Sequence, residues 1–565
     1  MDTQEFISSV EKTLKEKPED AINILRDPIN SEVLGKCCWE LIPRLSANLT
    51  EEYYIKNVNI YDCTVDLLLE IANTANPEDV FFEFIELAEK QKFFRSFINI
   101  LRAIRILLMR APQRRGTSIS WCCSAIGHYL SEINLPQNSK LEGDEELILE
   151  NDVQFQLVEE VYIEVLDFFS PFIEEIESGN YTVSEKHIDI YKDTLLKYLL
   201  KLFGHPLVST YLEHSNNKSA FRRIAEKILQ YIACFHIDFF SFLEYATFSS
   251  KENINLESEF NNLSLGVFYY LILVEGLYIN EISHVYSNLY LFRQILWLCL
   301  TLMNSEDSRA HWKGLSLAEN ILKRIVEKEL DFKKIDRFQS QEFVQLCSKI
   351  MIYSDSKRNR QKAVAIFTTF IRIFNPCGRY YLLLCIPEKI KEPGLIGYLS
   401  VKAKDFIAEA LLRKNLEELK YFNGKCLHDL IKKFCSLEND TETDLMRYAD
   451  QIVPSLNLLR YLVLRDKTNF TGIFDLIPIL EKTYFSPLQK AIEISRAHYN
   501  LQKKEIHQSS GDSNQKFPTA VSVGGENLPE FSLEQKLQIL NNALNMFDLI
   551  ESLLTRLTEC INDQS

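Results

Sequence analysis

Hydrophobic residues recur along this chain with the three- and four-residue spacing of amphipathic helices, and the pattern is strong in the segment 450–466. At about 100° per residue, one stripe of this segment collects aliphatic side chains that a helix would bury against its neighbours. That stripe comprises Ile452, Leu456, Leu459 and Val463, with Leu458 and Leu462 beside it. Pro454 lacks the N–H group that a helix interior needs, so we expect the helix that carries Arg460 to begin there.

The opposite side of the same helix carries Asn457, Arg460 and Tyr461, where packing does not require them. An amide, a planar cation and an aromatic ring can bury area in a protein contact while keeping their hydrogen bonds. A solvated helix face that happens to carry Tyr and Arg would have the same spacing. The pattern alone leaves both interpretations open.

The helical period continues over the whole chain, with Pro and Asn in the gaps. Helices are expected at 33–45, 63–72, 80–89, 93–109, 153–169, 187–203, 221–235, 263–278, 286–303, 311–325, 341–353, 361–374, 380–385, 397–412, 424–434, 441–465 and 484–503, with a last long helix from about 532. Glycine is scarce, at 17 residues, which disfavours sandwiches and Rossmann sheets. We therefore predict an all-α fold, a HEAT/armadillo-like helical-repeat solenoid in two parts.

Two polar stretches divide this pattern. The segment 247–262 is poor in apolar residues and predicts a boundary near residue 255, between an N-terminal helical-repeat domain (1–255) and a C-terminal one (256–565). The segment 504–530 is rich in Ser, Gly, Asn and Gln, and predicts a mobile loop with a short strand at 520–523.

Composition and charge narrow the class of protein. The chain is 46% apolar, which is enough for a packed interior, and its net charge of −16 would repel nucleic acid and anionic membrane. Its 13 cysteines contain no C-x-x-C pair and are typical of reduced thiols in a helical core. The first residues lack the apolar core of a signal peptide, and no apolar run is long enough to cross a bilayer. We expect a cytoplasmic protein that could also enter the nucleus.

No catalytic or cofactor motif is present: the sequence has no G-x-G-x-x-G, Walker A, H-E-x-x-H or G-x-S-x-G, and its ten histidines are dispersed. We expect no catalytic, cofactor or metal site. Arginines cluster at 102–115, around a predicted helix end that favours cations. The basic run 357–362 is short enough for a nuclear-import signal, but it also fits a solvated turn that opens a helix.

Several strings resemble the glomulin family, which includes the plant aberrant-root-formation proteins. They occur in order over residues 263–561 and read VFYYLILVEGLYI (267–279), SNLYLF (287–292), GRYYLLLCI (378–386), SLNLLRYLV (455–463), AHYN (497–500), VSVGGENLP (521–529) and MFDLIESLLTRL (546–557). Residues 1–250 share the helical style with only scattered similarity. Each string is weak alone, and their order makes the resemblance specific.

The resemblance implies a non-enzymatic HEAT-like protein. Members of this family bind the RING domain of the RING-box subunit of cullin–RING ubiquitin ligases, and their C-terminal repeats cover the RING surface that the ubiquitin-conjugating enzyme would use. The chain is then expected to be a monomer until it binds the RING-box–cullin complex. A RING contact surface is apolar and aromatic, so it calls for exposed aromatics and polar anchors on a rigid helical ridge.

The residues that fit this description lie in four places of the second half. They are Tyr421 and Phe422; Asn457, Arg460 and Tyr461; Tyr499; and Asn541, Asn545 and Asp548. Where the family is expected to have a Trp-Phe pair, this chain has Tyr421-Phe422. The alternative function is a generic helical-repeat scaffold or adaptor with other protein clients, and an enzyme would need a pocket of convergent titratable groups.

Overall fold

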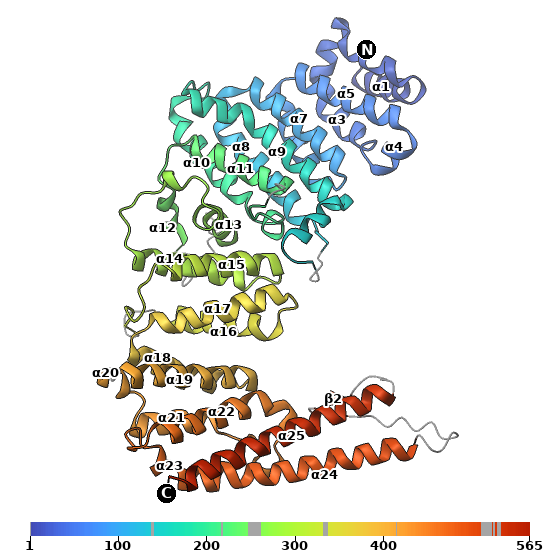
Figure 1. Ribbon diagram of the computed structural model, residues 1–565. Coiled ribbons are helices and arrows are strands. Elements are labelled where there is room, and N and C mark those ends of the chain that lie inside the picture. Colours follow the sequence, from blue (N-terminus) through green and yellow to red (C-terminus); the bar gives the residue numbers. More distant parts are fainter. Residues whose placement is uncertain are drawn as a thin grey trace. The chain divides into compact units, whose positions relative to one another are not determined.

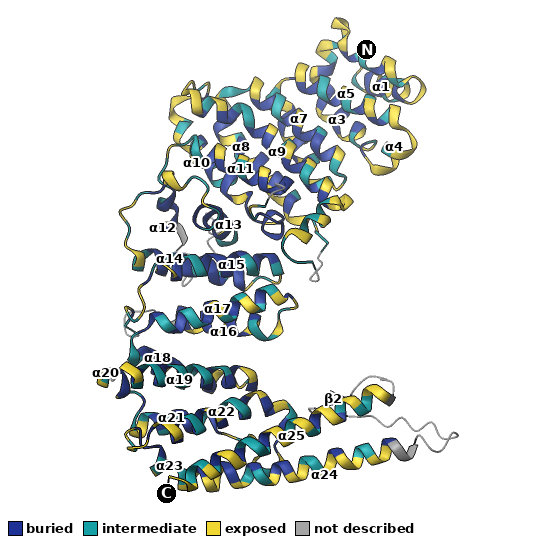
Figure 2. Ribbon diagram, in the orientation of Figure 1, coloured by how far each residue is buried: buried dark blue, intermediate teal, exposed yellow. Residues whose placement is uncertain are grey.

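The fold is an all-α helical-repeat architecture, as the sequence pattern predicts. The computed structural model describes residues 2–136, 141–215, 219–246, 261–331, 337–413, 415–509, 522–523, 526–527 and 533–564. Consecutive helices pack as antiparallel pairs that bury their apolar stripes and expose their polar sides (Figures 1 and 2). The predicted fold class is therefore confirmed, and the domain boundary expected near residue 255 lies outside the described residues.

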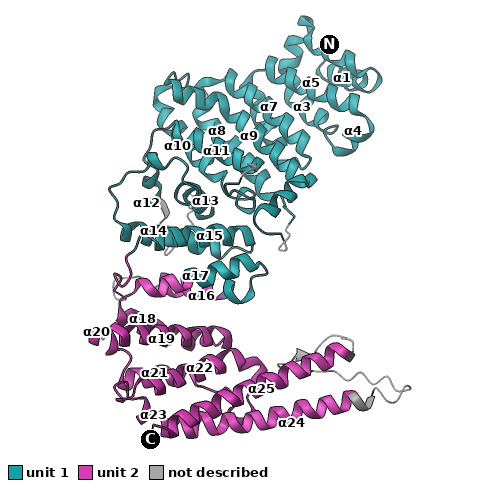
Figure 3. Cartoon of the chain, viewed as in Figure 1, with its two compact units in different colours: residues 1–325, 349–366 teal, residues 326–348, 367–565 magenta. Residues whose placement is uncertain are grey.

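The chain divides into two compact units (Figure 3): unit 1 comprises residues 1–325 and 349–366, and unit 2 comprises 326–348 and 367–565. Unit 1 contains α1 (Thr3–Glu16), α2 (Ala21–Arg26), α3 (Ser31–Ser46), α4 (Glu51–Lys56), α5 (Val58–Thr74), α6 (Pro77–Lys90), α7 (Phe94–Arg110), α8 (Arg115–Glu132), α9 (Val153–Ser178), α10 (Ile188–Lys201), α11 (Ala220–Ala233), α12 (Leu243–Ala246), α13 (Asn262–Leu273), α14 (Asn288–Met303) and α15 (Ser308–Leu322). The division passes through α16 (Arg337–Tyr353) and α17 (Lys357–Ile373).

Unit 2 continues with α18 (Pro376–Lys389), α19 (Pro393–Arg413), α20 (Leu416–Leu419), α21 (Gly424–Phe434), α22 (Leu445–Arg465), α23 (Ile473–Leu480), α24 (Ser486–Ser509) and α25 (Leu533–Asn562). A π-helical turn, Glu481–Phe485, joins α23 to α24. Within this unit the pairs α18–α19, α21–α22 and α24–α25 form successive layers (Figure 1).

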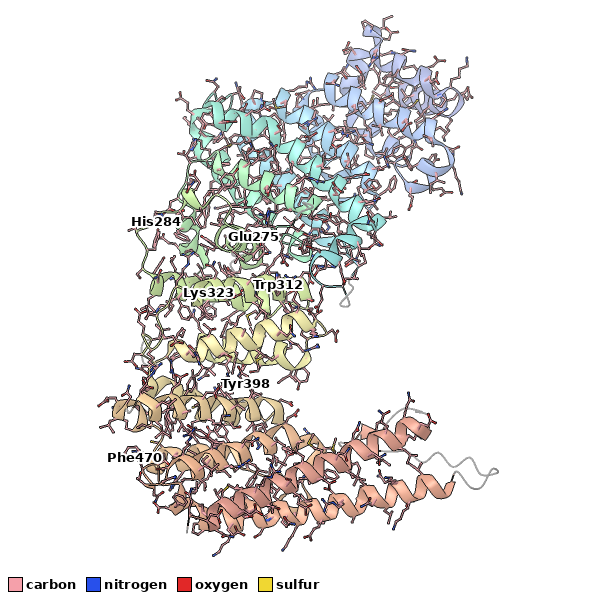
Figure 4. The ribbon with its side chains drawn as sticks, viewed as in Figure 1. Glu275, His284, Trp312, Lys323, Tyr398 and Phe470 are labelled. Carbon is pink, nitrogen blue, oxygen red and sulfur yellow. The ribbon has the colours of Figure 1, made fainter. Side chains whose placement is uncertain are left out.

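Hydrogen bonds that cross residue 255 explain why α13 to α15 belong with the helices before them. The buried Arg222 guanidinium of α11 donates from Nη1 to Glu275 Oε2 (2.7 Å), just after α13. The other Glu275 oxygen accepts from Tyr270 (2.8 Å), and Figure 4 labels Glu275. Lys313 of α15 donates to the carbonyls of Val208 and Thr210 at 2.8 and 2.7 Å. These bonds connect helices on either side of the polar segment 247–262 within unit 1, and the domain boundary near residue 255 stays a prediction.

Both basic clusters found in the sequence form links within unit 1. At the first, Arg110 donates to the carbonyls of Ala72 and Ala75 (2.6 and 2.7 Å), and Arg115, which is 1% exposed, donates to Glu175 (2.6 Å).

At the second, the Arg358 guanidinium is bidentate on Glu213 (3.0 and 2.6 Å) and lies 3.5 Å from the ring centre of Trp312, which Figure 4 labels. Lys362 lies 3.9 Å from the same ring. The solvated-turn interpretation of 357–362 does not describe these side chains, since they hold α17 to its neighbours.

The polar segment 504–530 is partly helical. The helix α24 runs to Ser509, beyond the expected end at residue 503, and residues 510–521, 524–525 and 528–532 lie outside the described part of the chain. Two residue pairs there form an antiparallel ladder, β1 (Ser522–Val523) with β2 (Glu526–Asn527), in which Ser522 pairs with Asn527. The strand expected at 520–523 therefore overlaps β1, and the mobile loop stays a prediction.

The contact between α19 and α22 requires a glycine at residue 397. A Cβ atom built on Gly397 would overlap the backbone carbonyl oxygen of Asp450 in α22, and backbone has little room to yield. Pro454 has no N–H to bond this carbonyl, and α22 nevertheless runs unbroken through Pro454 from Leu445 to Arg465. The expectation that a helix begins at Pro454 is thus wrong, because packing against α19 supports the uninterrupted helix.

We predict that Gly397→Ala lowers the free energy of unfolding by about 1–3 kcal/mol or more, because the added methyl group forces α19 and α22 apart. Gly394→Ala is the matched control on the same helix, since nothing lies within 4 Å of a Cβ at that position. Urea unfolding of both variants, monitored by the circular-dichroism signal of the helices, measures the difference in their free energies of unfolding. Equal unfolding midpoints would refute the close packing at Gly397.

Candidate protein-binding surface

The helix α22 is fixed at both ends and along one side. At its start the Asp444 carboxylate accepts from the backbone N–H groups of Met446 and Arg447 (3.0 and 3.3 Å). Along its length Gln451 and Ser455 donate to the carbonyl oxygen of Phe434, at 3.0 and 3.1 Å. That carbonyl ends α21, where helix geometry leaves acceptors without intrahelical donors. The side chains of α22 therefore project from a rigid support.

The turn that follows α22 is held by a buried carboxylate. Asp466 is 3% exposed and accepts from the backbone N–H groups of Phe470 (2.8 Å) and Thr471 (2.6 Å), and from the Thr471 hydroxyl (2.5 Å). Three donors on one carboxylate offset much of the cost of removing its charge from water. This turn sets the C-terminal limit of the exposed side of α22.

The exposed side of α22 contains the central candidate residues. Asn457 is exposed, Tyr461 is half-buried, and Leu464 is 42% exposed, at the helical spacing i, i+4 and i+7. Arg460 lies beside this stripe and is half-buried. The row predicted to face inward is buried, as Ile452, Leu456, Leu459 and Val463 are each at most 1% exposed.

The half-buried side chain of Arg460 contains one nitrogen that is shielded from solvent. Its Nε lies out of reach of solvent and has no hydrogen-bond partner among the residues that the structure describes. A buried polar group without a partner costs about 1–3 kcal/mol, and more when it is charged. A partner cannot reach the shielded Nε, but its acceptors could bond the Nη groups of the half-buried guanidinium, and a hydrogen bond to a charged group contributes about 1.5–3 kcal/mol.

The helices α24 and α25 form an antiparallel pair that carries the other polar candidates. Arg496 of α24 donates to Asp548 (2.7 Å) and Glu551 (2.6 Å) of α25, and Lys503 donates to Asn541 (2.7 Å). The hydrogen bond from Arg496 lowers the pKa of Glu551, since it stabilises the carboxylate. Asn541 and Asp548 are exposed yet already bonded within unit 2, so they also serve to join α24 to α25.

Asn545 lies between these two residues on the same stripe of α25 and is exposed. The helix α25 packs against both α22 and α24, so the structure brings the candidate residues of α22 and α25 onto neighbouring helices. Of the polar candidates on α25, Asn545 is the one without an internal hydrogen bond among the described residues.

Three aromatic candidates differ from the expected exposed anchors. Phe422 is 2% exposed and Tyr499 is 6% exposed, with the Tyr499 ring edge-to-face on Phe547 at 5.2 Å. Tyr421 is half-buried, with its ring centre 6.2 Å from that of Tyr380 in α18. The expectation of exposure is wrong for Phe422 and Tyr499, because neighbouring helices cover them.

Exposed aliphatic side chains on the same helices were not singled out in the sequence. Ile494 and Leu501 of α24 are 51% and 57% exposed, and Leu549 of α25 is 46% exposed. The seven-residue spacing of Ile494 and Leu501, on a side of α24 apart from its buried apolar row, could have indicated them in the sequence. Together with Leu464 they supply apolar area beside the polar anchors, which is the composition of protein interfaces.

The described residues contain no group of three His, Cys, Asp or Glu side chains able to hold a metal ion. Over the same part of the chain, no helix is long and apolar enough to cross a membrane. The thirteen cysteines are reduced, and seven of them are buried.

Comparison with known proteins gives relatives over nearly the whole chain. Residues 282–543 match the model of a family described as an uncharacterised protein family, YAP/Alf4/glomulin. Glomulin of Homo sapiens is 26% identical over 564 residues, which cover 96% of this chain and 90% of the human protein. Glomulin of Mus musculus is also 26% identical, with 96% and 91% covered. The family match includes α22 and α24, and it ends within α25.

We predict that Phe422→Ala and Tyr499→Ala each lower the free energy of unfolding by about 3 kcal/mol, because each leaves a cavity in a packed core. Tyr461→Ala, the half-buried control on α22, should cost about 1 kcal/mol or less. Urea unfolding of the full chain measures all three. If Tyr461→Ala is as destabilising as the other two, Tyr461 belongs to the core and its assignment to a binding surface fails.

Proposed function

Since the chain belongs to the YAP/Alf4/glomulin family, we propose that it is a non-enzymatic regulator that binds the RING domain of the RING-box subunit of cullin–RING ubiquitin ligases. The binding surface would be the exposed side of α22 together with α25. By covering the patch that the ubiquitin-conjugating enzyme needs, the chain would inhibit ubiquitin transfer. We further propose that it acts in the cytoplasm and is a monomer until it meets the ligase.

The observation that carries this proposal is the half-buried guanidinium of Arg460 on the exposed side of α22. It lies beside Asn457 and Tyr461 on a helix whose other sides are fixed by packing. Arginine and tyrosine are enriched among the residues that dominate interface energies, because they bury area and hydrogen-bond at once. Rigid support matters as well, since little ordering entropy is then lost on binding.

Under this proposal, inhibition requires only that the chain occupies the RING surface. Two proteins cannot contact the same RING patch together, so the complex with this chain excludes the conjugating enzyme by mass action. The exposed aliphatic residues Leu464, Ile494 and Leu501 suit an apolar RING surface, while the amides around them can bond its backbone. No group on this chain has to react with ubiquitin.

We predict that Arg460→Ala combined with Tyr461→Ala weakens binding of the full chain to a purified RING-box–cullin complex by about 10- to 100-fold. Isothermal titration calorimetry measures the affinity, and a ubiquitin-transfer assay should show the same loss of inhibition. Arg413→Ala combined with Tyr353→Ala is the matched control, since both residues are exposed and lie on other helices. Tight binding that Arg460→Ala with Tyr461→Ala does not change would support the proposed function and contradict the assignment of this surface. Absence of binding at micromolar concentration would leave a helical scaffold with other clients.

We also predict that inhibition is competitive with the conjugating enzyme. The concentration of this chain that halves ubiquitin transfer should rise in proportion to the conjugating enzyme once that enzyme exceeds its own dissociation constant. Initial rates over a grid of both concentrations test this. Inhibition that excess conjugating enzyme does not relieve would contradict masking and indicate action elsewhere on the ligase.

A further inference from the structure

Unit 1 has an exposed aromatic strip that the proposed inhibition does not use. It consists of Trp39 on α3, Phe82 on α6 and Trp121 on α8, whose exposed fractions are 51%, 62% and 53%. Large aromatic side chains more than half exposed to water are costly when they gather, so such patches mark binding sites. We call these three residues the aromatic strip.

The three residues lie on helices that pack in succession. The helix α6 packs against both α3 and α8. The rings of Phe82 and Trp121 meet edge-to-face with their centres 6.1 Å apart. On the other side of α6, the exposed Trp39 lies on α3, which packs against α6.

The charges around Phe82 favour a cationic partner. The helix α6 carries five carboxylates, Glu78, Asp79, Glu83, Glu86 and Glu89, and one ammonium group, on Lys90, which is already paired with Glu86. Acidic residues occupy the positions three and four residues before Phe82 and four and seven residues after it, and these four residues are exposed. An aromatic ring bracketed by carboxylates is an environment that suits a guanidinium group.

The two flanking helices bring no excess of positive charge. On α3, Lys36 is paired with Glu32 at 2.7 Å, and Arg44 approaches Glu11 at 3.8 Å. On α8, the nearest residues on the Trp121 side are Thr117 and Ser124, both exposed and uncharged. A Cβ at Gly35, one turn before Trp39, would meet nothing within 4 Å, so the surface beside Trp39 is open.

We propose that the aromatic strip binds an extended, arginine-rich segment of a partner protein. Guanidinium groups stack on indole and phenyl faces, and they pair with carboxylates in a fork geometry, so one side chain satisfies both features of this surface. Neighbouring helices are about 8–10 Å apart, which puts the ends of the strip roughly 20 Å from each other. An extended segment of about six residues spans that distance, and its alternate side chains face the surface.

The test uses the full chain and a fluorescein-labelled peptide of about eight residues that alternates arginine with serine, a length chosen to span the strip. We expect saturable binding by fluorescence anisotropy, and about fivefold or greater weakening for each of Trp39→Ala, Phe82→Ala and Trp121→Ala. Phe470→Ala is the control, because Phe470, labelled in Figure 4, is 44% exposed on unit 2. A peptide with glutamine in place of arginine should not bind.

A second pair of variants separates a specific site from general attraction to a chain with a net charge of −16. Binding of the arginine peptide should be weaker when Glu86→Gln is combined with Glu89→Gln. It should not change when Glu534→Gln is combined with Glu559→Gln on α25, which alters the net charge equally at exposed residues. Equal effects of both pairs would overturn the proposal, as would aromatic variants that bind like the parent chain. If an alanine variant loses helical content, Phe82→Leu replaces it, since it keeps the apolar area and removes the ring. A concentration-dependent dimer that Phe82→Ala abolishes would assign the strip to self-association instead.

Discussion

The close approach of α19 to α22 decides which side of α22 a partner can reach. Pro454 leaves the Asp450 carbonyl without the N–H that the helix would otherwise supply, and Gly397 lets α19 come near enough to cover that carbonyl. Gln451 and Ser455 add hydrogen bonds to the end of α21. A helix held on these sides cannot rotate about its axis, so its one exposed stripe follows from contacts made elsewhere on it.

In unit 1, buried ion pairs connect segments that are distant in the sequence. Arg222 and Arg115 are almost fully buried, and each donates to a carboxylate from a distant part of the chain, Glu275 and Glu175 respectively. Removing two charges from water costs much of what their attraction returns, so such pairs are weak sources of net stability. Losing one partner, however, leaves a buried charge uncompensated. We interpret these pairs as devices that fix which helices pack together in a chain of similar amphipathic helices.

The hydrophobic period predicted the existence of most helices, because each buries one face against its neighbours whatever the details of packing. The hydrophobic period did not predict α8, because that helix is rich in Ser and Gly and its period is weak. Trp121, which lies on α8, was missed for the same reason. The period also could not tell which side chains a neighbouring helix covers, so Tyr499, which lies on Phe547, was taken for a surface residue. The exposure of Asn457 and the burial of the opposite row of α22 could be predicted, because one helix contains both patterns.

The two candidate surfaces would select partners by opposite chemistry. The guanidinium of Arg460 on unit 2 can only donate hydrogen bonds, so an acidic or carbonyl-rich contact would gain most there. Phe82 on unit 1 is surrounded by carboxylates, so a basic segment gains most at that place. Like charges brought together cost free energy, so each proposed surface would disfavour the partner that the other would bind. One segment of a partner could not satisfy both surfaces, so occupying the strip on unit 1 need not relieve the inhibition that we propose for unit 2.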